Sequence, residues 1–233
     1  MPLSSAEFAE ELRATIDAGR SFGGHPLWLR IQRGEVPRED VATFAIQFFL
    51  QVREFPRSIS ALHASCPYPE ERAELAENLY EEETGRISGC GLSHPELFLR
   101  FGSGLGLSRE QLVEGKALAA TAALIDWFEL STKQRSFIEG SAAMNLAAEG
   151  QVPGSFAPFA RGLQKHYGLS DEEVAFWDVH ETADREHSDV GKHIVAAFAT
   201  SDEWQDRVRR AVEHSLAMWW QFFDGIQAAT AGA

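Results

Sequence analysis

Cysteines, basic residues and long hydrophobic runs are all scarce in this sequence. Cys66 and Cys90 are the only thiols, which argues against a disulfide scaffold and against a cysteine-based zinc site. Lys and Arg number 21 against 35 Asp and Glu, and the net charge of −14 disfavours binding to nucleic acid or to an anionic membrane surface. No run reaches the ~20 apolar residues of a membrane span. The N-terminus is acidic and amphipathic, unlike a signal peptide, so we expect a cytoplasmic protein.

Helical periodicity fills most of the chain. Phe8, Leu12 and Ile16 recur at a spacing of four, and Ser170 with Glu173 forms a capping box. Strand-like alternation and a glycine-rich phosphate motif are absent from the sequence. We therefore predict an all-α protein in which residues 1–233 form one bundle of about seven helices.

One predicted helix is apolar on almost every side. Residues 41–66 include Phe44, Phe48 and Phe49, which is typical of a buried central helix. Pro56 falls in the middle of this segment and is expected to kink it.

The strongest chemical signal is a triplet near residue 180. His180, Asp184 and His187 stand at i, i+4 and i+7, so a helix places all three on one face. That face continues through Trp177 and Ile194, which indicates that it points inward. Imidazole and carboxylate suit iron, manganese or zinc. A solvated polar face is the alternative interpretation.

Other candidate ligands are spread along the chain. Glu149 lies in an otherwise small and apolar stretch, where a carboxylate is out of place on a core face, although it could also be an exposed helix end. The run of acids at 81–83 could be an ordinary charged surface, and His94 could simply begin a helix. Together with the triplet, these residues could form a carboxylate–histidine site inside a bundle.

These motifs resemble the haem-oxygenase-like diiron oxidases and oxygenases, and within them most closely the branch of the Chlamydia protein associating with death domains. The resemblance covers nearly the whole chain and implies a haem-oxygenase-like bundle. It is carried by HPLWLRIQRGEVPRED, FAIQFFLQVREFPRSISALHASC, NLYEEETG, HPELFLRFGSGLGL, AAEGQVPG, RGLQKHYGL and HETADREHSDVGKH.

The resemblance implies six metal ligands. One iron would take Glu82, His94 and His180, and the other would take Glu149, Asp184 and His187. The 31 residues from Glu149 to His180 suit the family, whereas the 12 from Glu82 to His94 exceed its closest branch. RISGCGLS would be the insertion, and Glu83 remains a rival for Glu82.

The resemblance also implies the reaction class. Family members activate O2 at two irons and oxidise small molecules such as amino acids or amines, by N-oxygenation, desaturation or C–C cleavage. Manganese, or a mixed iron–manganese pair, would use the same ligands. We expect a small-molecule substrate and a homodimer; the aromatic run Trp219, Trp220, Phe222 and Phe223 is predicted to be core or dimer contact.

The sequence departs from the 4-aminobenzoate-forming branch of the family. That branch consumes a tyrosine of its own chain and needs a lysine, and the aligned positions here are Trp28 and Phe159. This departure favours an external substrate. The alternatives are a 4-aminobenzoate synthase-like enzyme, a metal-free enzyme like TenA or pyrroloquinoline-quinone synthase, and an acidic helical interaction protein.

Overall fold

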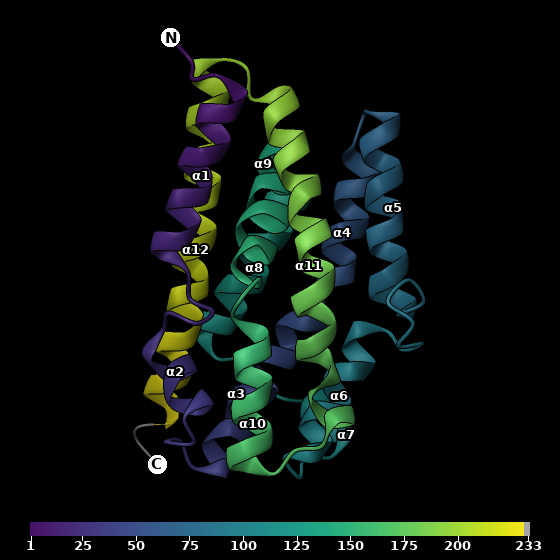
Figure 1. Cartoon of the computed structure of the whole chain (residues 1–233), viewed down its shortest axis with the longest axis vertical. Coiled ribbons are helices and arrows are strands. Elements are labelled where there is room, and N and C mark those ends of the chain that lie inside the picture. Colours follow the sequence, from purple (N-terminus) through teal and green to yellow (C-terminus); the bar gives the residue numbers. More distant parts are fainter. Residues whose placement is uncertain (231–233) are drawn as a thin grey trace.

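Figure 1 shows the computed structural model, which describes the backbone of residues 1–230 and the side chains of residues 1–181 and 193–230. All regular structure in residues 1–230 is helical, as predicted. The α-helices are α1 (Ser5–Gly19), α2 (Pro26–Gln32), α3 (Arg38–Val52), α4 (Phe55–Ser65), α5 (Pro69–Thr84), α6 (His94–Gly104), α7 (Arg109–Val113), α8 (Ala119–Lys133), α9 (Phe137–Ser141), α10 (Phe156–Tyr167), α11 (Asp171–Phe198) and α12 (Asp202–Thr230). A π-helix, η1 (Ala142–Ala148), and a 3-10 turn, η2 (Glu149–Gln151), follow α9.

The expected number of about seven helices is wrong, because the described chain contains 12 α-helices. The difference comes from breaks that were expected to be kinks. The segment 41–66 divides into α3 and α4, and Pro56 occupies the first turn of α4, where its missing N–H costs nothing. The buried faces of α3 confirm that this segment is central.

Helix ends follow the local signals of the sequence. The capping box of Ser170 and Glu173 opens α11 as predicted. Ser108 with Gln111, and Ser136 with Glu139, form two further boxes at the starts of α7 and α9. These caps satisfy backbone N–H groups that the first helical turn leaves without partners.

The two longest helices, α11 and α12, organise the bundle. In Figure 1, α1 runs beside α12, while α5 and α4 stand together on the opposite side of α11. An aromatic core fills the space between these helices, and Trp28, Phe44, Trp177 and Phe223 are fully buried in it. The core therefore packs against the first half of α11 around Trp177, close to His180. Among the described residues, no helix combines the length and apolarity that a membrane span requires.

Candidate metal centre

Three of the six expected ligands meet inside the bundle. Glu82 on α5, His94 at the start of α6 and His180 on α11 each offer a donor atom, and these atoms all lie within 4.8 Å of one another. The exposed fractions of the three residues are 2%, 0% and 9%. Two imidazoles and one carboxylate are the donor set of many non-haem Fe(II) sites, so the chemistry of this group fits iron.

The connection between α5 and α6 brings two of these donors together. Gly85 ends α5 in a left-handed conformation with φ of 58°, and a Cβ at this position would lie 2.1 Å from the Leu92 carbonyl oxygen. The N–H of Gly91 donates to the Gly85 carbonyl at 2.8 Å and closes the loop. The chain then returns to the site at His94. The loop accounts for the separation of 12 positions between Glu82 and His94.

His94 lies between two buried carboxylates. Its Nδ1 is 3.0 Å from Glu82 Oε1, and its Nε2 is 3.5 Å from Glu81 Oε1. The second oxygen of Glu81 accepts hydrogen bonds from the N–H groups of Ile87 at 2.7 Å and Ser88 at 3.2 Å. Burial raises the pKa of Glu81, but the hydrogen bonds from Ser88 and Ile87 outweigh it and hold the pKa below its ordinary value. A charged Glu81 can therefore accept the Nε2–H of His94 and leave Nδ1 facing Glu82.

The orientation of His180 is set by its own helix. Its Nδ1 lies 2.7 Å from the carbonyl oxygen of Phe176, one turn earlier on α11. A carbonyl only accepts, so Nδ1 carries the proton and Nε2 keeps its lone pair for a metal. The neighbouring Glu181 accepts from the N–H groups of Gly154, Phe156 and Ala157, which fixes this part of α11 against α10.

Glu149 reaches the same cavity from a different direction. It follows the π-helix η1, whose residues are all buried, and is itself 3% exposed. Asn145 donates to Glu149 Oε2 at 3.2 Å, and Ser215 of α12 donates to the Ala143 carbonyl within η1 at 2.8 Å. Single π-turns occur often at functional sites, and this one places a carboxylate in a core of small apolar residues.

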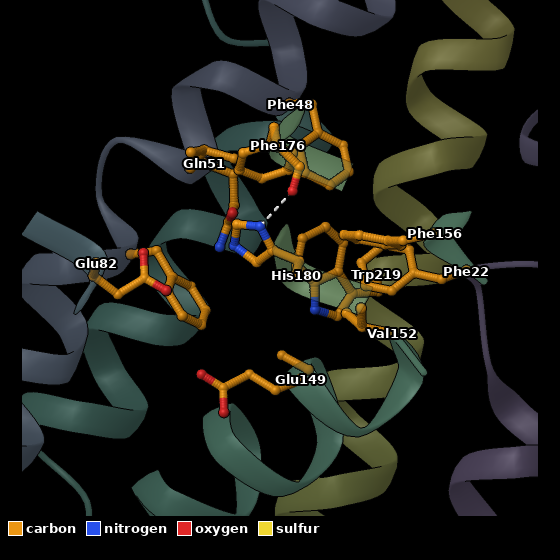
Figure 2. Close-up of a pocket in the computed structure, with 13 residues that line it drawn as sticks. Phe22, Phe48, Gln51, Glu82, Glu149, Val152, Phe156, Phe176, His180 and Trp219 are labelled. Atoms are coloured by element: carbon orange, nitrogen blue, oxygen red, sulfur yellow. Dashed lines mark hydrogen bonds between the residues drawn. The ribbon is translucent and has the colours of Figure 1, made fainter. Parts of the chain in front are cut away.

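A small cavity connects Glu82, Glu149 and His180. Its volume of about 50 Å³ holds a few water molecules. Figure 2 shows the carboxylates of Glu82 and Glu149 directed into it from different elements, with His180 between α3 and the aromatic wall. The wall is built mainly from the rings of Phe22, Phe48, Phe55, Phe156, Phe176 and Trp219.

The six predicted ligands differ in where the structure places them. Glu82 lies in the cluster, whereas the side chain of its rival Glu83 is exposed. Glu149 faces the cavity but is not part of the group within 4.8 Å. The side chains of Asp184 and His187 lie outside the described residues. The six-ligand assignment therefore stays a prediction.

Sequence reasoning missed two polar residues at this site, Glu81 and Gln51. Glu81 was grouped with its acidic neighbours, although it stands four residues before Gly85 at the end of α5. Gln51 was hidden within an apolar helix and lines the cavity. A buried polar position in an otherwise apolar segment is the signal that could have found Gln51.

A family model described as "Iron-containing redox enzyme" matches residues 42–220, which is more than half of the chain. The chain belongs to this family. Members of the iron-containing redox enzyme family are oxidoreductases, and the two imidazoles and one carboxylate that meet here agree with that class. The predicted enzyme class and the haem-oxygenase-like fold are both confirmed.

Curated proteins similar to this chain include two kinds of synthase. A 4-aminobenzoate synthase of Nitrosomonas europaea is 32% identical over 234 residues, covering 96% of this chain and 92% of its own. A pyrroloquinoline-quinone synthase of Cronobacter sakazakii is 23% identical, covering 94% and 87%. Among solved structures, a TenA homologue from Pseudomonas syringae superposes with a TM-score of 0.81 at 16% identity, covering 95% and 93%, and supports the fold alone.

Proposed function

We propose that this protein is a non-haem diiron oxidase or oxygenase of the branch that includes the Chlamydia protein associating with death domains, and that it oxidises a small amino acid or amine with O2. The observation that carries the proposal is the convergence of Glu82, His94 and His180 in a buried cavity. A second metal position would use Glu149 together with Asp184 and His187. Bound iron would supply the redox chemistry that amino acid side chains lack.

The chain's own residues prepare the site for a metal. His180 presents Nε2 because Phe176 holds Nδ1, and His94 is oriented between Glu81 and Glu82. The aromatic wall excludes bulk water from the side opposite the carboxylates. Such a largely apolar, preorganised setting strengthens electrostatic interactions.

Anaerobic Fe(II) titration of the purified protein tests the proposal. We expect about two irons per chain, followed by O2 uptake and a transient visible absorption when air is admitted. His180→Ala should lose at least one of these irons, because it removes an imidazole from the cluster. A wild-type protein that binds no iron at micromolar concentration contradicts the proposal.

A second candidate is 4-aminobenzoate synthesis, which the relative from Nitrosomonas europaea favours by its name and its 32% identity. Against it, Trp28 and Phe159 occupy the positions where that branch has its reactive tyrosine and lysine, and they stack on each other with ring centroids 3.9 Å apart. None of the tyrosines is among the described residues that line the cavity. Detection of 4-aminobenzoate after the O2 step of the same titration would support this candidate.

A further inference from the structure

Two glutamines one turn apart on α3 are both buried but have different surroundings. Gln47 is 4% exposed and Gln51 is 3% exposed. The amide of Gln47 makes three hydrogen bonds: it donates to the Lys116 carbonyl at 3.0 Å and accepts from the Leu118 N–H at 2.9 Å and the Thr121 hydroxyl at 2.7 Å. The amide of Gln51 makes no hydrogen bond to any residue that the structure describes.

The amide of Gln51 has no protein partner among the described residues, and its polar atoms are left accessible where the side chain lines the cavity. Taking an amide out of water without a replacement hydrogen bond costs ~1–3 kcal/mol. Gln47 shows that α3 can pair both the oxygen and the nitrogen of an amide with protein groups. The partner of the Gln51 amide is therefore a molecule in the cavity, either water or a ligand that replaces it.

The position of Gln51 agrees with such a partner. Figure 2 shows its amide directed into the cavity on the side of His180. Gln51 also lines a second pocket, of about 170 Å³, which opens at the surface beside the exposed side chains of Arg57 and Lys133. Gln51 therefore lines both the cavity beside Glu82 and His180 and this outer pocket.

We propose that Gln51 is a substrate-binding residue, and that the substrate combines a small apolar body with a hydrogen-bonding carbonyl, hydroxyl or amine group. The rings of Phe48, Phe156 and Phe176 contact the body, and the amide of Gln51 binds the polar group, from α3. Because the amide can both donate and accept, it fixes the orientation of the substrate in front of the metal ligands. This assignment rests on the proposed function, since it takes the cavity to be the place of reaction.

The first test compares the thermal stability of two matched variants of the iron-supplemented protein. Gln47→Met leaves the Leu118 N–H and the Thr121 hydroxyl without their acceptor, so its Tm falls by at least about 3 °C. Gln51→Met removes an amide that has no hydrogen-bond partner among the described residues, so its Tm stays unchanged or rises. A fall for Gln51→Met as large as that for Gln47→Met assigns Gln51 a structural role and overturns the proposal.

The second test uses two small ligands of one shape, acetone and isobutene. Binding is measured from headspace partitioning over solutions of the wild type and of Gln51→Met. We expect the variant to bind acetone about 3- to 10-fold more weakly, which corresponds to the loss of one hydrogen bond, and to bind isobutene no more weakly. Equal changes for the two ligands, or no change for the ketone, overturn the proposal.

Iron content separates this inference from the proposed function. Gln51→Met keeps all the candidate ligands, so it should hold as much iron as the wild type. If the wild type holds no iron, the proposed function fails, while the ratio of the two ligand affinities still decides the role of Gln51. If both proteins hold iron and the ratio of ketone affinity to hydrocarbon affinity is the same in Gln51→Met as in the wild type, only the inference about Gln51 fails.

Discussion

At the scale of single residues, the most informative arrangement is an imidazole between two carboxylates of unequal role. Glu82 and Glu81 are consecutive, and both are buried against His94. Glu82 belongs to the donor cluster, whereas Glu81 is held by the backbone N–H groups of the loop that follows α5. A carboxylate behind a histidine ligand fixes the tautomer and raises the basicity of the ligand.

Glu81→Gln should weaken iron binding by about 10- to 100-fold. The glutamine carbonyl would take the N–H groups of Ile87 and Ser88, and its NH2 group would then face Nε2 of His94. That pairing moves the ring proton to Nδ1, the nitrogen nearest Glu82, where it opposes a metal. Competition of the protein with a coloured chelator for Fe(II) measures the change.

Glu83→Gln is the matched control, because it changes the adjacent residue, whose side chain is exposed. Its iron affinity should equal that of the wild type. If Glu81→Gln binds Fe(II) as tightly as this control, Glu81 only stabilises the loop after α5 and does not affect the metal site. The Tm of each metal-free variant separates weaker binding from loss of the fold.

At the scale of elements, the short helix α9 leads directly into the π-helix η1 and is anchored by a buried carboxylate. Glu139 receives a hydrogen bond from the Ser136 hydroxyl at 2.6 Å and another from Arg207 of α12 at 2.8 Å. Burial raises the pKa of Glu139, but these hydrogen bonds outweigh it and hold the pKa below its ordinary value. One carboxylate thus ties the start of α9 to α12.

Glu139→Gln should lower the free energy of unfolding at pH 7 by about 1–3 kcal/mol, because it leaves Arg207 without its buried partner. A lowered folded-state pKa stabilises the protein above the unfolded pKa of about 4.5, and this contribution is lost as the pH falls through the folded value. The difference between wild type and variant should therefore shrink below pH 4.5. Urea unfolding across this range measures it.

Glu129→Gln provides the comparison for Glu139→Gln. Glu129 pairs with Lys133 at 2.8 Å, but both side chains are about half exposed. An exposed pair of this kind contributes much less to stability than a buried one, because solvent screens it. Equal losses of unfolding free energy in the two variants would show that the Glu139–Arg207 link between α9 and α12 stabilises the protein no more than an exposed ion pair.

Local sequence signals predicted helix boundaries well where a single residue or cap determines where a helix starts or stops. The capping box of Ser170 and Glu173 lies where expected, and Pro56 does interrupt the apolar segment. The π-helix could not be predicted in this way, because its small residues also suit an α-helix. Its extra residue per turn depends on packing against α11 and α12 and on the Ser215 hydrogen bond, which are tertiary contacts.

At the scale of the whole molecule, the resemblance predicted the fold and three residues that do come together. Glu82, His94 and His180 are far apart in sequence, and only the ordered motifs of a family could connect them. The role of Glu81, and the lack of a partner for the Gln51 amide among the described residues, could not be predicted, since both depend on which polar atoms meet inside the bundle. That property appears only when the helices are packed.

Iron should stabilise the whole bundle, because the cluster joins α5, α6 and α11 and forms only in the folded chain. At a free Fe(II) concentration 100-fold above Kd, the gain is ~2.7 kcal/mol, which corresponds to a rise in Tm of about 5–10 °C for a chain of this length. Anaerobic scanning calorimetry before and after chelation measures the shift. His180→Ala should lose most of it, since it removes the α11 donor. A shift of the same size in His180→Ala would place the stabilising iron elsewhere, and no shift in the wild type would mean that the three helices hold no metal at all.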